Sequence, residues 1–303
     1  MIEVKTEIKK YLKHCSLEKN LSEHTLKAYR IDLSQFIAFK SGIGISKEDL
    51  TEYIHHLHKV YKPKTIKRKI ATLKAFVHHL YYEEIIEFNP FDKIDTSFKE
   101  PLRLPHTIPE NIIQQLLRTS YQNISSSITV HQKLVSVRNT AIIELLFATG
   151  ARISEICSLK IHNIDFASKT VRIFGKGAKE RIIQIENDDV IAILMKYLLL
   201  MSDSTHPDSY LFQNNRHSRI SEQSVRTIIR NLEKQIVAPI HITPHMFRHS
   251  VATLLLEEDV DIRYIQRILG HSSITTTQIY TLVTSSKQRE ILRTKHPRNK
   301  IHI

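Results

Sequence analysis

The chain has 303 residues, of which 44 are lysine or arginine and 31 are aspartate or glutamate, giving a formal net charge of +13. Such an excess of positive charge repels itself and is typical of proteins that bind a polyanion, with nucleic acid as the first candidate. The sequence has no CxxC pair, no run of about 20 apolar residues and no glycine-rich phosphate loop, which argues against a disulfide scaffold, a membrane span and a nucleotide-binding motif.

The alternatives to a nucleic-acid partner are a merely basic soluble protein and a protein of the membrane surface. The N-terminus, Met1–Lys5, has no apolar signal-peptide region, and Cys15 and Cys157 show no metal-ligand spacing. We therefore expect a cytoplasmic, reducing environment, no metal, no cofactor and no membrane partner. Only 6 glycines and no tryptophan in the whole chain predict a mainly helical protein with few tight turns.

A helical domain is predicted for residues 1–90. Ser22 is a candidate N-cap for a helix whose apolar residues recur at three- and four-residue steps, and Ser46 with Asp49 resembles a capping pair for the next helix. After Pro63, a further helix has an apolar side and a basic side. The basic side carries Lys62, Lys64, Lys67, Arg68, Lys69 and Lys74. We interpret this side as a face for DNA phosphates, with a solvated helix face as the alternative, because the whole chain has the same basic bias.

Helical periodicity breaks between residues 91 and 105. Pro101 and Pro105 interrupt it, and basic side chains such as Lys93 and Arg103 keep the segment positively charged. We interpret residues 91–105 as a basic linker between two lobes. A tether of this kind would let the lobes close around a duplex.

The second lobe, residues 106–303, is predicted to combine helices with a small antiparallel sheet, so that the whole chain is mainly α. Thr170–Phe174 and Arg181–Ile185 alternate apolar and polar residues as paired strands do, with Gly175–Glu180 as their turn. A polar loop is expected at Tyr121–Lys133. Helices are predicted at Pro109–Ser120, Val137–Ala148, Asp188–Met201, Glu222–Ile236, His245–Glu257, Ile262–Leu269 and Ile274–Thr281, with a basic tail helix from Ser286 to about His296.

Six residues of this lobe suit a single site that cuts a nucleic-acid backbone. They are Arg152, Lys176, His245, Arg248, His271 and Tyr280. The first five carry or donate positive charge, and the sixth is a phenol on a polar stretch where a buried core tyrosine is not expected. A phosphodiester under attack becomes a phosphorane with added negative charge, and the planar fork of arginine matches two phosphate oxygens at once. Each residue alone is a weak signal.

Arg152 and Lys176 lie at breaks between predicted elements. Arg152 follows Gly150, which permits a backbone turn after an apolar helix, and Glu155, one helical turn further on, is placed to hold its guanidinium. Lys176 lies between two glycines at the hairpin tip, from which its side chain can enter a groove and protonate a leaving oxygen. Lys179 is its closest competitor for that role and a further candidate for DNA contact.

His245 and Arg248 are three residues apart at the start of a predicted helix and therefore point the same way. Thr243 is a candidate cap, and a phosphate near this helix start would meet free backbone N–H groups and the positive end of the dipole. His249 points about a quarter-turn away and is interpreted as structural. His271 follows the end of another predicted helix and can donate a hydrogen bond to a phosphate oxygen.

The segment that carries the phenol, Thr275–Thr281, is rich in β-branched threonines, which are poor helix formers. We hypothesise that it is marginally stable and moves Tyr280 in and out of line with phosphorus. Hydrogen exchange as slow in this segment as in the core helices would contradict the hypothesis.

Four short segments occur in order along the second lobe. They are ATGARISE at Ala148–Glu155, GKG at Gly175–Gly177, HMFRH at His245–His249, and Leu269–Tyr280, which begins LGH. Together they closely resemble the tyrosine recombinase, or phage integrase, family, and their order and spacing look most like its bacterial Xer branch. The resemblance covers nearly the full length and implies a helical core-binding N-terminal domain followed by an α+β catalytic domain with a C-terminal tail helix.

The resemblance implies a site-specific DNA recombinase. Tyr280 would attack the phosphate and form a 3′-phosphotyrosyl link, and Lys176 would act as general acid on the departing 5′-oxygen. His245 would assist proton transfer from the phenol. Three residues would bind the non-bridging oxygens and stabilise the phosphorane: Arg152, Arg248 and His271. Two rounds of strand exchange would pass through a Holliday junction, and rejoining would need no ATP.

The resemblance also implies the partners. The DNA would be a recombination site with inverted half-sites, bound by a homotetramer or by a heterotetramer with a paralogous recombinase. The 23 residues after Tyr280 are long enough for a helix that docks in trans into a neighbouring subunit. A DNA translocase is a candidate activator. The biological role stays open between dimer resolution of chromosomes or plasmids and integration of phages or other mobile elements.

Two other functions are compatible with the sequence. A type IB topoisomerase resembles this chemistry but relaxes supercoils without exchanging partners, and the helical N-terminal domain argues against it. A non-catalytic architectural DNA-binding protein could keep the same fold, and the presence of a suitable residue at all six catalytic positions argues against that.

Overall fold

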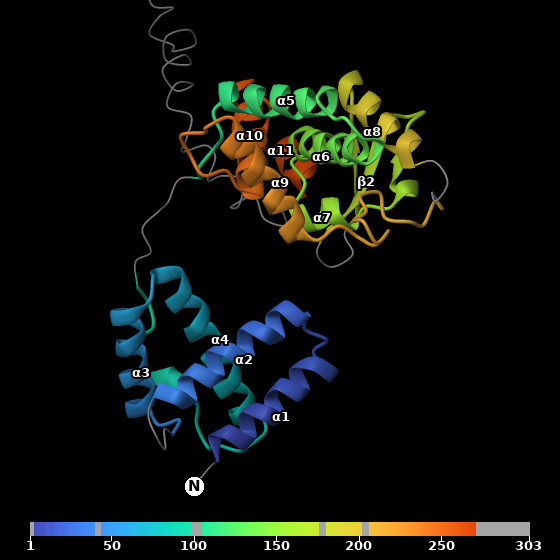
Figure 1. Cartoon of the computed structure of the whole chain (residues 1–303). Helices are drawn as coiled ribbons and strands as arrows, with labels where there is room; N and C mark the ends of the chain where they lie inside the picture. Colours follow the sequence, from blue (N-terminus) through green and yellow to red (C-terminus); the bar gives the residue numbers. More distant parts are fainter. Residues whose placement is uncertain (1–2, 40–43, 99–104, 176–179, 202–205, 271–303) are drawn as a thin grey trace, which may run out of the picture. The chain divides into compact units, whose positions relative to one another are not determined.

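Two groups of helices, each with its own buried core, make up the chain. Contacts divide it into the units Met1–Leu102 and Arg103–Ile303 (Figure 1). In this computed structural model the described residues are 3–39, 44–98, 105–175, 180–201 and 206–270. They are mainly helical with one small antiparallel sheet, so the predicted fold class is confirmed. None of the helices in these ranges is long and apolar enough to cross a bilayer.

The first unit is built from amphipathic helices that share one core. Tyr11, Phe36, Leu57 and Phe76 are among its almost wholly buried residues. The predicted Ser46 cap is present, because the Asp49 N–H donates to Ser46 Oγ at 3.1 Å. The elements are α1 (Val4–Leu17), α2 (Glu23–Phe39), α3 (Lys47–Val60), α4 (Pro63–Tyr82) and the 3₁₀ turn η1 (Pro90–Lys93).

The first residues of the predicted linker belong to this core. Phe91 is only 7% exposed and lies in the apolar cluster of the first unit, with Ile94 and Phe98 packed against it. In the sequence, the three apolar residues are separated by charged residues and have prolines on either side, so they did not indicate a buried segment. Residues 91–98 of the predicted linker therefore pack with the first unit, and residues 99–104 lie outside the described ranges.

Lys69 does not lie on the basic, DNA-facing side of α4 where the sequence placed it. Its side chain is 2% exposed, and its ammonium donates to Asp32 Oδ1 at 2.9 Å and lies 4.9 Å from the centroid of the Tyr61 ring. Asp32 is also buried and accepts hydrogen bonds from Arg68 and from Thr72. Lys69 falls one helical turn after a core residue, Ile66, so the buried stripe of α4 is wider than its apolar residues indicate.

The other candidate DNA contacts on α4 are exposed. They are Lys64, Lys67, Arg68 and Lys74. Lys74 donates to Thr96 Oγ1 at 2.6 Å, and Arg68 is held by Asp32. A row of exposed cations along one helix is the arrangement that phosphate binding requires.

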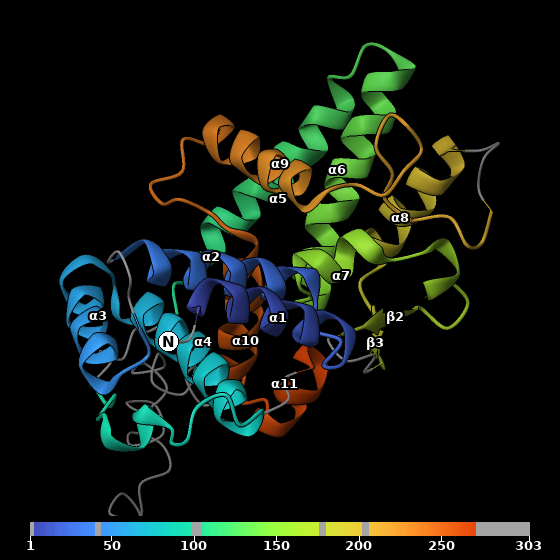
Figure 2. The same ribbon diagram turned by 90° about the horizontal axis from the view of Figure 1, so that it is seen from below.

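In the second unit, α6 is the central helix. Ile142, Ile143, Leu145 and Leu146 are wholly buried, so the second half of α6 is covered on every side, whereas its first turn, from Val130, is exposed. Helices α5, α8, α9 and α10 pack against it, and Figures 1 and 2 show α5 and α6 running side by side. The elements are α5 (Glu110–Ser125), α6 (Val130–Thr149), α7 (Ile153–Ser158), η2 (Ile161–Asn163), α8 (Asp188–Met201), α9 (Glu222–Gln235), α10 (Pro244–Glu257) and α11 (Ile262–Leu269).

Most of the polar loop predicted at Tyr121–Lys133 is helical. Helix α5 continues to Ser125, and α6 begins at Val130 behind a reciprocal cap between Thr129 and Gln132. The Tyr121 hydroxyl donates to Glu144 at 2.9 Å, which secures the last turns of α5 against α6. The polar residues of this stretch are surface positions of two long helices, which the sequence pattern alone did not show.

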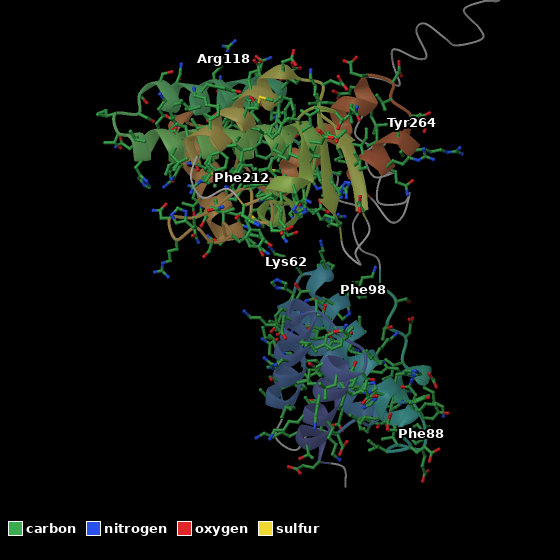
Figure 3. The ribbon with its side chains drawn as sticks, turned by 90° about the vertical axis from the view of Figure 1, so that its right-hand side faces the viewer. Lys62, Phe88, Phe98, Arg118, Phe212 and Tyr264 are labelled. Atoms are coloured by element: carbon green, nitrogen blue, oxygen red, sulfur yellow. The ribbon has the colours of Figure 1, made fainter. Side chains whose placement is uncertain are left out.

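The described strands form one antiparallel sheet in the order β1 (Ile164–Asp165), β2 (Thr170–Phe174) and β3 (Glu180–Gln184). Val171 faces Ile183 in register, and the inward residues of β2 are wholly buried. The predicted hairpin is therefore present, whereas the two-residue strand β1 was not predicted. In Figure 3 the side chain of Phe212 lies inside this unit and that of Arg118 projects away from it.

The buried charges of the first unit predict an asymmetric response to mutation. Asp32→Asn is expected to lower the free energy of unfolding by about 3–5 kcal/mol, because it leaves the Lys69 ammonium buried without its counter-charge. The exposed pair of Arg226 with Glu222 is the control, and Glu222→Gln is expected to cost about 0–1 kcal/mol. Urea denaturation of the full chain measures both. Equal costs for the two substitutions would contradict this account.

Candidate active site

The turn that follows α6 positions Arg152. Gly150 ends α6 with a φ of +57°, a left-handed conformation that glycine adopts without strain. A Cβ atom at this position would lie 2.5 Å from Leu269 Cδ2, so the end of α6 packs directly against the end of α11. Arg152 comes two residues later as the N-cap residue of α7, with its side chain 36% exposed and therefore open to a ligand.

Glu155 holds Arg152 at two points. The Arg152 guanidinium donates to Glu155 Oε1 at 2.8 Å, and the Arg152 backbone N–H donates to Oε2 at 2.9 Å. The carboxylate is 5% exposed. Burial alone would raise the pKa of Glu155, but hydrogen bonds from Arg181 and Arg152 and the charge of Arg181 lower it below its ordinary value. The carboxylate is therefore a fixed negative charge behind Arg152, in the arrangement expected from the sequence.

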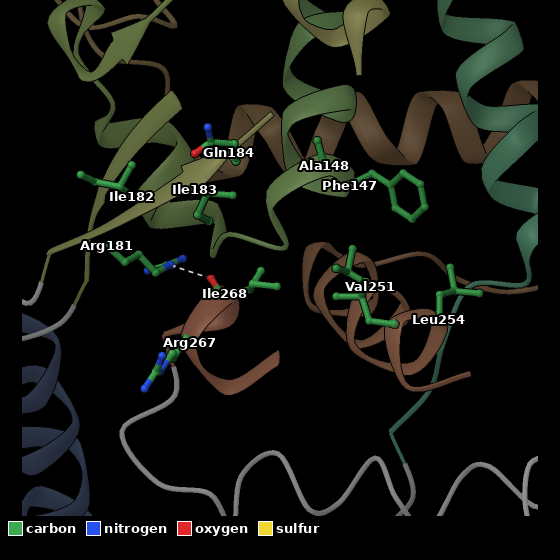
Figure 4. Close-up of a pocket in the computed structure, with 11 residues that line it drawn as sticks. Phe147, Ala148, Arg181, Ile182, Ile183, Gln184, Val251, Leu254, Arg267 and Ile268 are labelled. Atoms are coloured by element: carbon green, nitrogen blue, oxygen red, sulfur yellow. Dashed lines mark hydrogen bonds between the residues drawn. The ribbon is translucent and has the colours of Figure 1, made fainter. Parts of the chain in front are cut away.

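Arg181 is a member of this group that the sequence reading missed. It lies on β3 and donates to both oxygens of Glu155, at 3.2 Å from Nη1 and 2.7 Å from Nη2. Its Nε donates to the carbonyl oxygen of Ile268 at 3.0 Å (Figure 4). The alternation of the strand could have revealed it. Arg181 lies two residues before the buried Ile183, so both side chains point to the core-facing side of β3.

Arg248 joins the ends of two other helices. It lies on α10, is 4% exposed, and donates from Nη1 to the Gly150 carbonyl at 2.9 Å and from Nη2 to the Leu269 carbonyl at 2.6 Å. Both acceptors are terminal carbonyls of helices, which have no partner within the helix and carry the negative end of the dipole. The structure thus brings Arg248 to the turn that presents Arg152.

The two histidines of α10 have different surroundings. His245 is exposed in the first turn of the helix, three residues before Arg248. Burial, followed by the charges of His245, Arg248 and His106, lowers the pKa of His249 to about 4, so its imidazole is neutral near pH 7. Helix α10 begins at Pro244 with Thr243 as its N-cap residue, as predicted, although the Thr243 side chain makes no capping hydrogen bond.

Four of the sequence candidates lie outside the described residues: Lys176, Lys179, His271 and Tyr280. Their neighbours are described. Glu180 follows Lys179 at the start of β3, and Gly270, which precedes His271, ends α11 with a φ of +68°. The structure therefore brings together Arg152, its support Glu155, and Arg248, and it fixes the point from which the chain continues to His271.

An apolar cavity of about 540 Å³ opens beside these residues, between β3, α6, α10 and α11 (Figure 4). Phe147, Ile183, Val251 and Leu254 supply apolar walls, and Arg181 lines it on the side of α11. Its apolar lining suits a hydrophobic side chain better than a phosphate.

Two models of known protein families together match most of the chain. The model of the phage integrase family matches residues 108–287, and that of the phage integrase N-terminal SAM-like domain matches residues 8–84. A tyrosine recombinase of Agathobacter rectalis is 48% identical over 305 residues, covering 100% of both chains. Tyrosine recombinase XerC of Bacillus subtilis is 32% identical over 310 residues, covering 98% of each chain.

Solved structures show the same fold. The XerH site-specific recombinase bound to palindromic difH substrate, in a post-cleavage complex, matches with a TM-score of 0.76 at 21% identity over 93% of this chain and 83% of that one. A lambda integrase dimer bound to a core site matches with a TM-score of 0.68 at 17% identity, over 91% of this chain and 76% of that one.

The chain therefore belongs to the phage integrase family of tyrosine recombinases, and its activity is site-specific DNA recombination. The resemblance predicted from the four sequence segments is confirmed, including its Xer-like character. Neither the topoisomerase nor the architectural alternative is favoured by these relatives.

The lowered pKa of Glu155 predicts how stability depends on pH. Because its folded pKa lies below its ordinary value of 4.5, the ionised carboxylate contributes stability that is present above that value and lost as the pH falls through the folded pKa. Glu155→Gln is expected to lower the free energy of unfolding by about 3 kcal/mol at pH 7, and by less below about pH 4. Urea denaturation across this pH range checks it, with the exposed Glu186→Gln as control. A loss at pH 7 no larger than that of the control would contradict the prediction.

Proposed function

We propose that the chain cuts and rejoins DNA strands by transesterification at one site, with Tyr280 as the nucleophile. The observation that carries the proposal is the junction at Gly150, where Arg248 binds the backbone just before Arg152. Arg152 follows this turn and is open to a ligand, and Arg248 is bonded to the turn from α10, so the pair is suited to the two non-bridging oxygens of a phosphodiester. Their supports are rigid, so little reorganisation is needed when charge develops on the phosphorane.

The remaining roles follow the family pattern. Oη of Tyr280 bonds to phosphorus, the bond to the 5′-oxygen breaks, and the product is a 3′-phosphotyrosyl link. Lys176, or its competitor Lys179, gives a proton to the departing 5′-oxygen, and His271 adds a hydrogen bond to a non-bridging oxygen. His245 is exposed at the start of α10 and assists removal of the phenolic proton.

The covalent link conserves the free energy of the broken phosphodiester bond. A 5′-hydroxyl from a partner strand can therefore attack the link and restore a phosphodiester, releasing the phenol, without ATP. Two such exchanges, one for each pair of strands, pass through a Holliday junction. This sequence of steps needs four active sites on two DNA duplexes, so the expected assembly is a tetramer.

Double-stranded DNA is the proposed partner of both units. The exposed cations on α4 (Lys64, Lys67, Arg68 and Lys74) are suited to phosphate contacts in the first unit. Similar structures contain recombinases bound to DNA, such as XerH on difH and lambda integrase on a core site. We expect a site with inverted half-sites, bound by one kind of subunit or by two paralogous kinds.

We further propose that the tail after Tyr280 docks into the apolar cavity of a neighbouring subunit. The cavity is lined by Phe147, Val251 and Leu254, and residues such as Ile291, Leu292 and Ile301 provide apolar side chains in the tail. Docking in trans would pass each subunit's tail to the next and couple the active sites around the tetramer.

The similarity to XerC relatives favours a role in resolving chromosome or plasmid dimers in the cytoplasm. In that role a DNA translocase is the expected activator. Integration of a mobile element uses the same active site, and binding sites that flank the gene itself would favour integration over dimer resolution.

A nicked suicide substrate tests the chemistry. The wild-type chain is expected to form a covalent protein–DNA adduct at the scissile phosphate, and Tyr280→Phe to form none while it binds the same DNA with unchanged affinity. Tyr264→Phe is the control, because Tyr264 is an exposed tyrosine of α11 outside the proposed catalytic set. Denaturing gels follow the adduct. An adduct that persists in Tyr280→Phe, or none in the wild type despite tight binding, would refute the assignment.

Deletion of residues 285–303 tests the tail. The truncated chain is expected to cleave an isolated half-site within about threefold of the wild-type rate but to lose assembly on two sites, because a tail that docks in trans contributes at the subunit interface. Leu254→Ser in the cavity should reproduce this loss, and Leu199→Ser, on the exposed side of α8, should not. Native gels measure assembly. Normal assembly by the truncated chain would show that the tail does not make this contact.

A further inference from the structure

We propose that Arg181 is a positioning residue for cleavage, which offsets the negative charge of Glu155 behind Arg152, holds the Arg152 guanidinium in place and links it to the end of α11. The inference rests on the proposed function, in which Arg152 binds the scissile phosphate. Arg181 itself need not touch DNA. Its side chain is 11% exposed and its three nitrogens all donate to the protein.

The charges of the group give the first argument. Glu155 and Arg152 alone would form a neutral pair, which would weaken the attraction of Arg152 for a phosphate. Arg181 adds a second cation 2.7 Å from Glu155 Oε2, so the three side chains together carry one net positive charge. Glu155 can then fix the direction of the Arg152 guanidinium without cancelling its charge.

The geometry of the carboxylate gives the second argument. Each oxygen of Glu155 accepts one hydrogen bond from Arg152 and one from Arg181. Arg181 binds both oxygens through its fork, which prevents the carboxylate from rotating. Without Arg181, the buried Glu155 would keep two of its four donors and could turn, and the single side-chain bond from Arg152 would turn with it.

The third nitrogen connects the group to α11. Arg181 Nε binds the Ile268 carbonyl and Arg248 Nη2 binds the next carbonyl, that of Leu269. Gly270 follows in the left-handed conformation, and a Cβ atom there would lie 3.0 Å from Arg181 Cδ and Nη1. The two arginines therefore fix the last turn of α11, from which the chain leads on to His271. A shift of that turn would be transmitted through Arg181 to Glu155 and Arg152.

This arrangement predicts a defect in chemistry rather than in DNA binding. Arg181→Gln is expected to slow single-turnover cleavage of a nicked suicide substrate by about 10- to 100-fold at saturating protein, the usual range for loss of a residue that orients a reacting group. The Kd for the DNA site is expected to stay within about threefold. Arg226→Gln, which breaks an exposed arginine–glutamate pair on α9, is the control and should cleave at the wild-type rate.

Two further measurements separate positioning from a merely structural role. The first is a double-mutant cycle. If Arg181 acts through Arg152, then Arg152→Gln with Arg181→Gln should cleave no more slowly than Arg152→Gln alone. The second replaces the scissile phosphate by a methylphosphonate, which removes a charged oxygen. The defect of Arg181→Gln should then shrink to below about fivefold, because less negative charge requires stabilisation.

Three results would overturn the inference. They are additive losses in the double-mutant cycle, an equal cleavage defect on the phosphate and methylphosphonate substrates, and cleavage at the wild-type rate by Arg181→Gln. If Arg181→Gln fails to fold by circular dichroism, Arg181→Lys keeps the charge with fewer donors, and the same two readouts decide on that variant. Failure of the proposed function would appear differently, as absence of a Tyr280-dependent adduct in the wild-type chain.

Discussion

The site depends on one buried carboxylate shared by two arginines. Glu155 accepts four hydrogen bonds, two from Arg152 at the start of α7 and two from Arg181 on β3. A buried charge is costly unless it is paired and its hydrogen bonds are satisfied, and here both conditions hold. The pairing therefore fixes the relative positions of α7 and the sheet, and leaves Arg152 partly exposed toward a ligand.

A third arginine links this group to the helical core. Arg248 is buried on α10 and uses its guanidinium to satisfy the terminal carbonyls of α6 and α11. Around these bonds, Val251 and Leu269 belong to a small apolar cluster between α10 and α11, and the second half of α6 is enclosed by its neighbours. Helix ends that are held both by packing and by charged donors move little, which suits a site that stabilises a transient phosphorane.

Features that depend on neighbours in sequence could be predicted. The bounds of α11 were predicted correctly because an apolar stripe ends at a glycine, and the β2–β3 hairpin because its residues alternate. The polar residues at 121–133 led to the wrong prediction of a loop, since the polar surface of a helix has the same composition as a loop. Arg181 was missed because its partners Glu155 and Ile268 are 26 and 87 residues away. Lys69 likewise pairs with Asp32 across 37 residues, so no local pattern indicated that it is buried.

The central claim is that Arg152 and Arg248 act on one phosphate, with Glu155 and Arg181 behind Arg152. A crystal structure of the Tyr280→Phe chain on DNA with an intact scissile phosphate tests this directly. The account predicts hydrogen bonds from both guanidinium groups to non-bridging oxygens of that same phosphate, with Glu155 between Arg152 and Arg181. Contacts from the two arginines to different phosphates, or Glu155 turned away from Arg152, would contradict it.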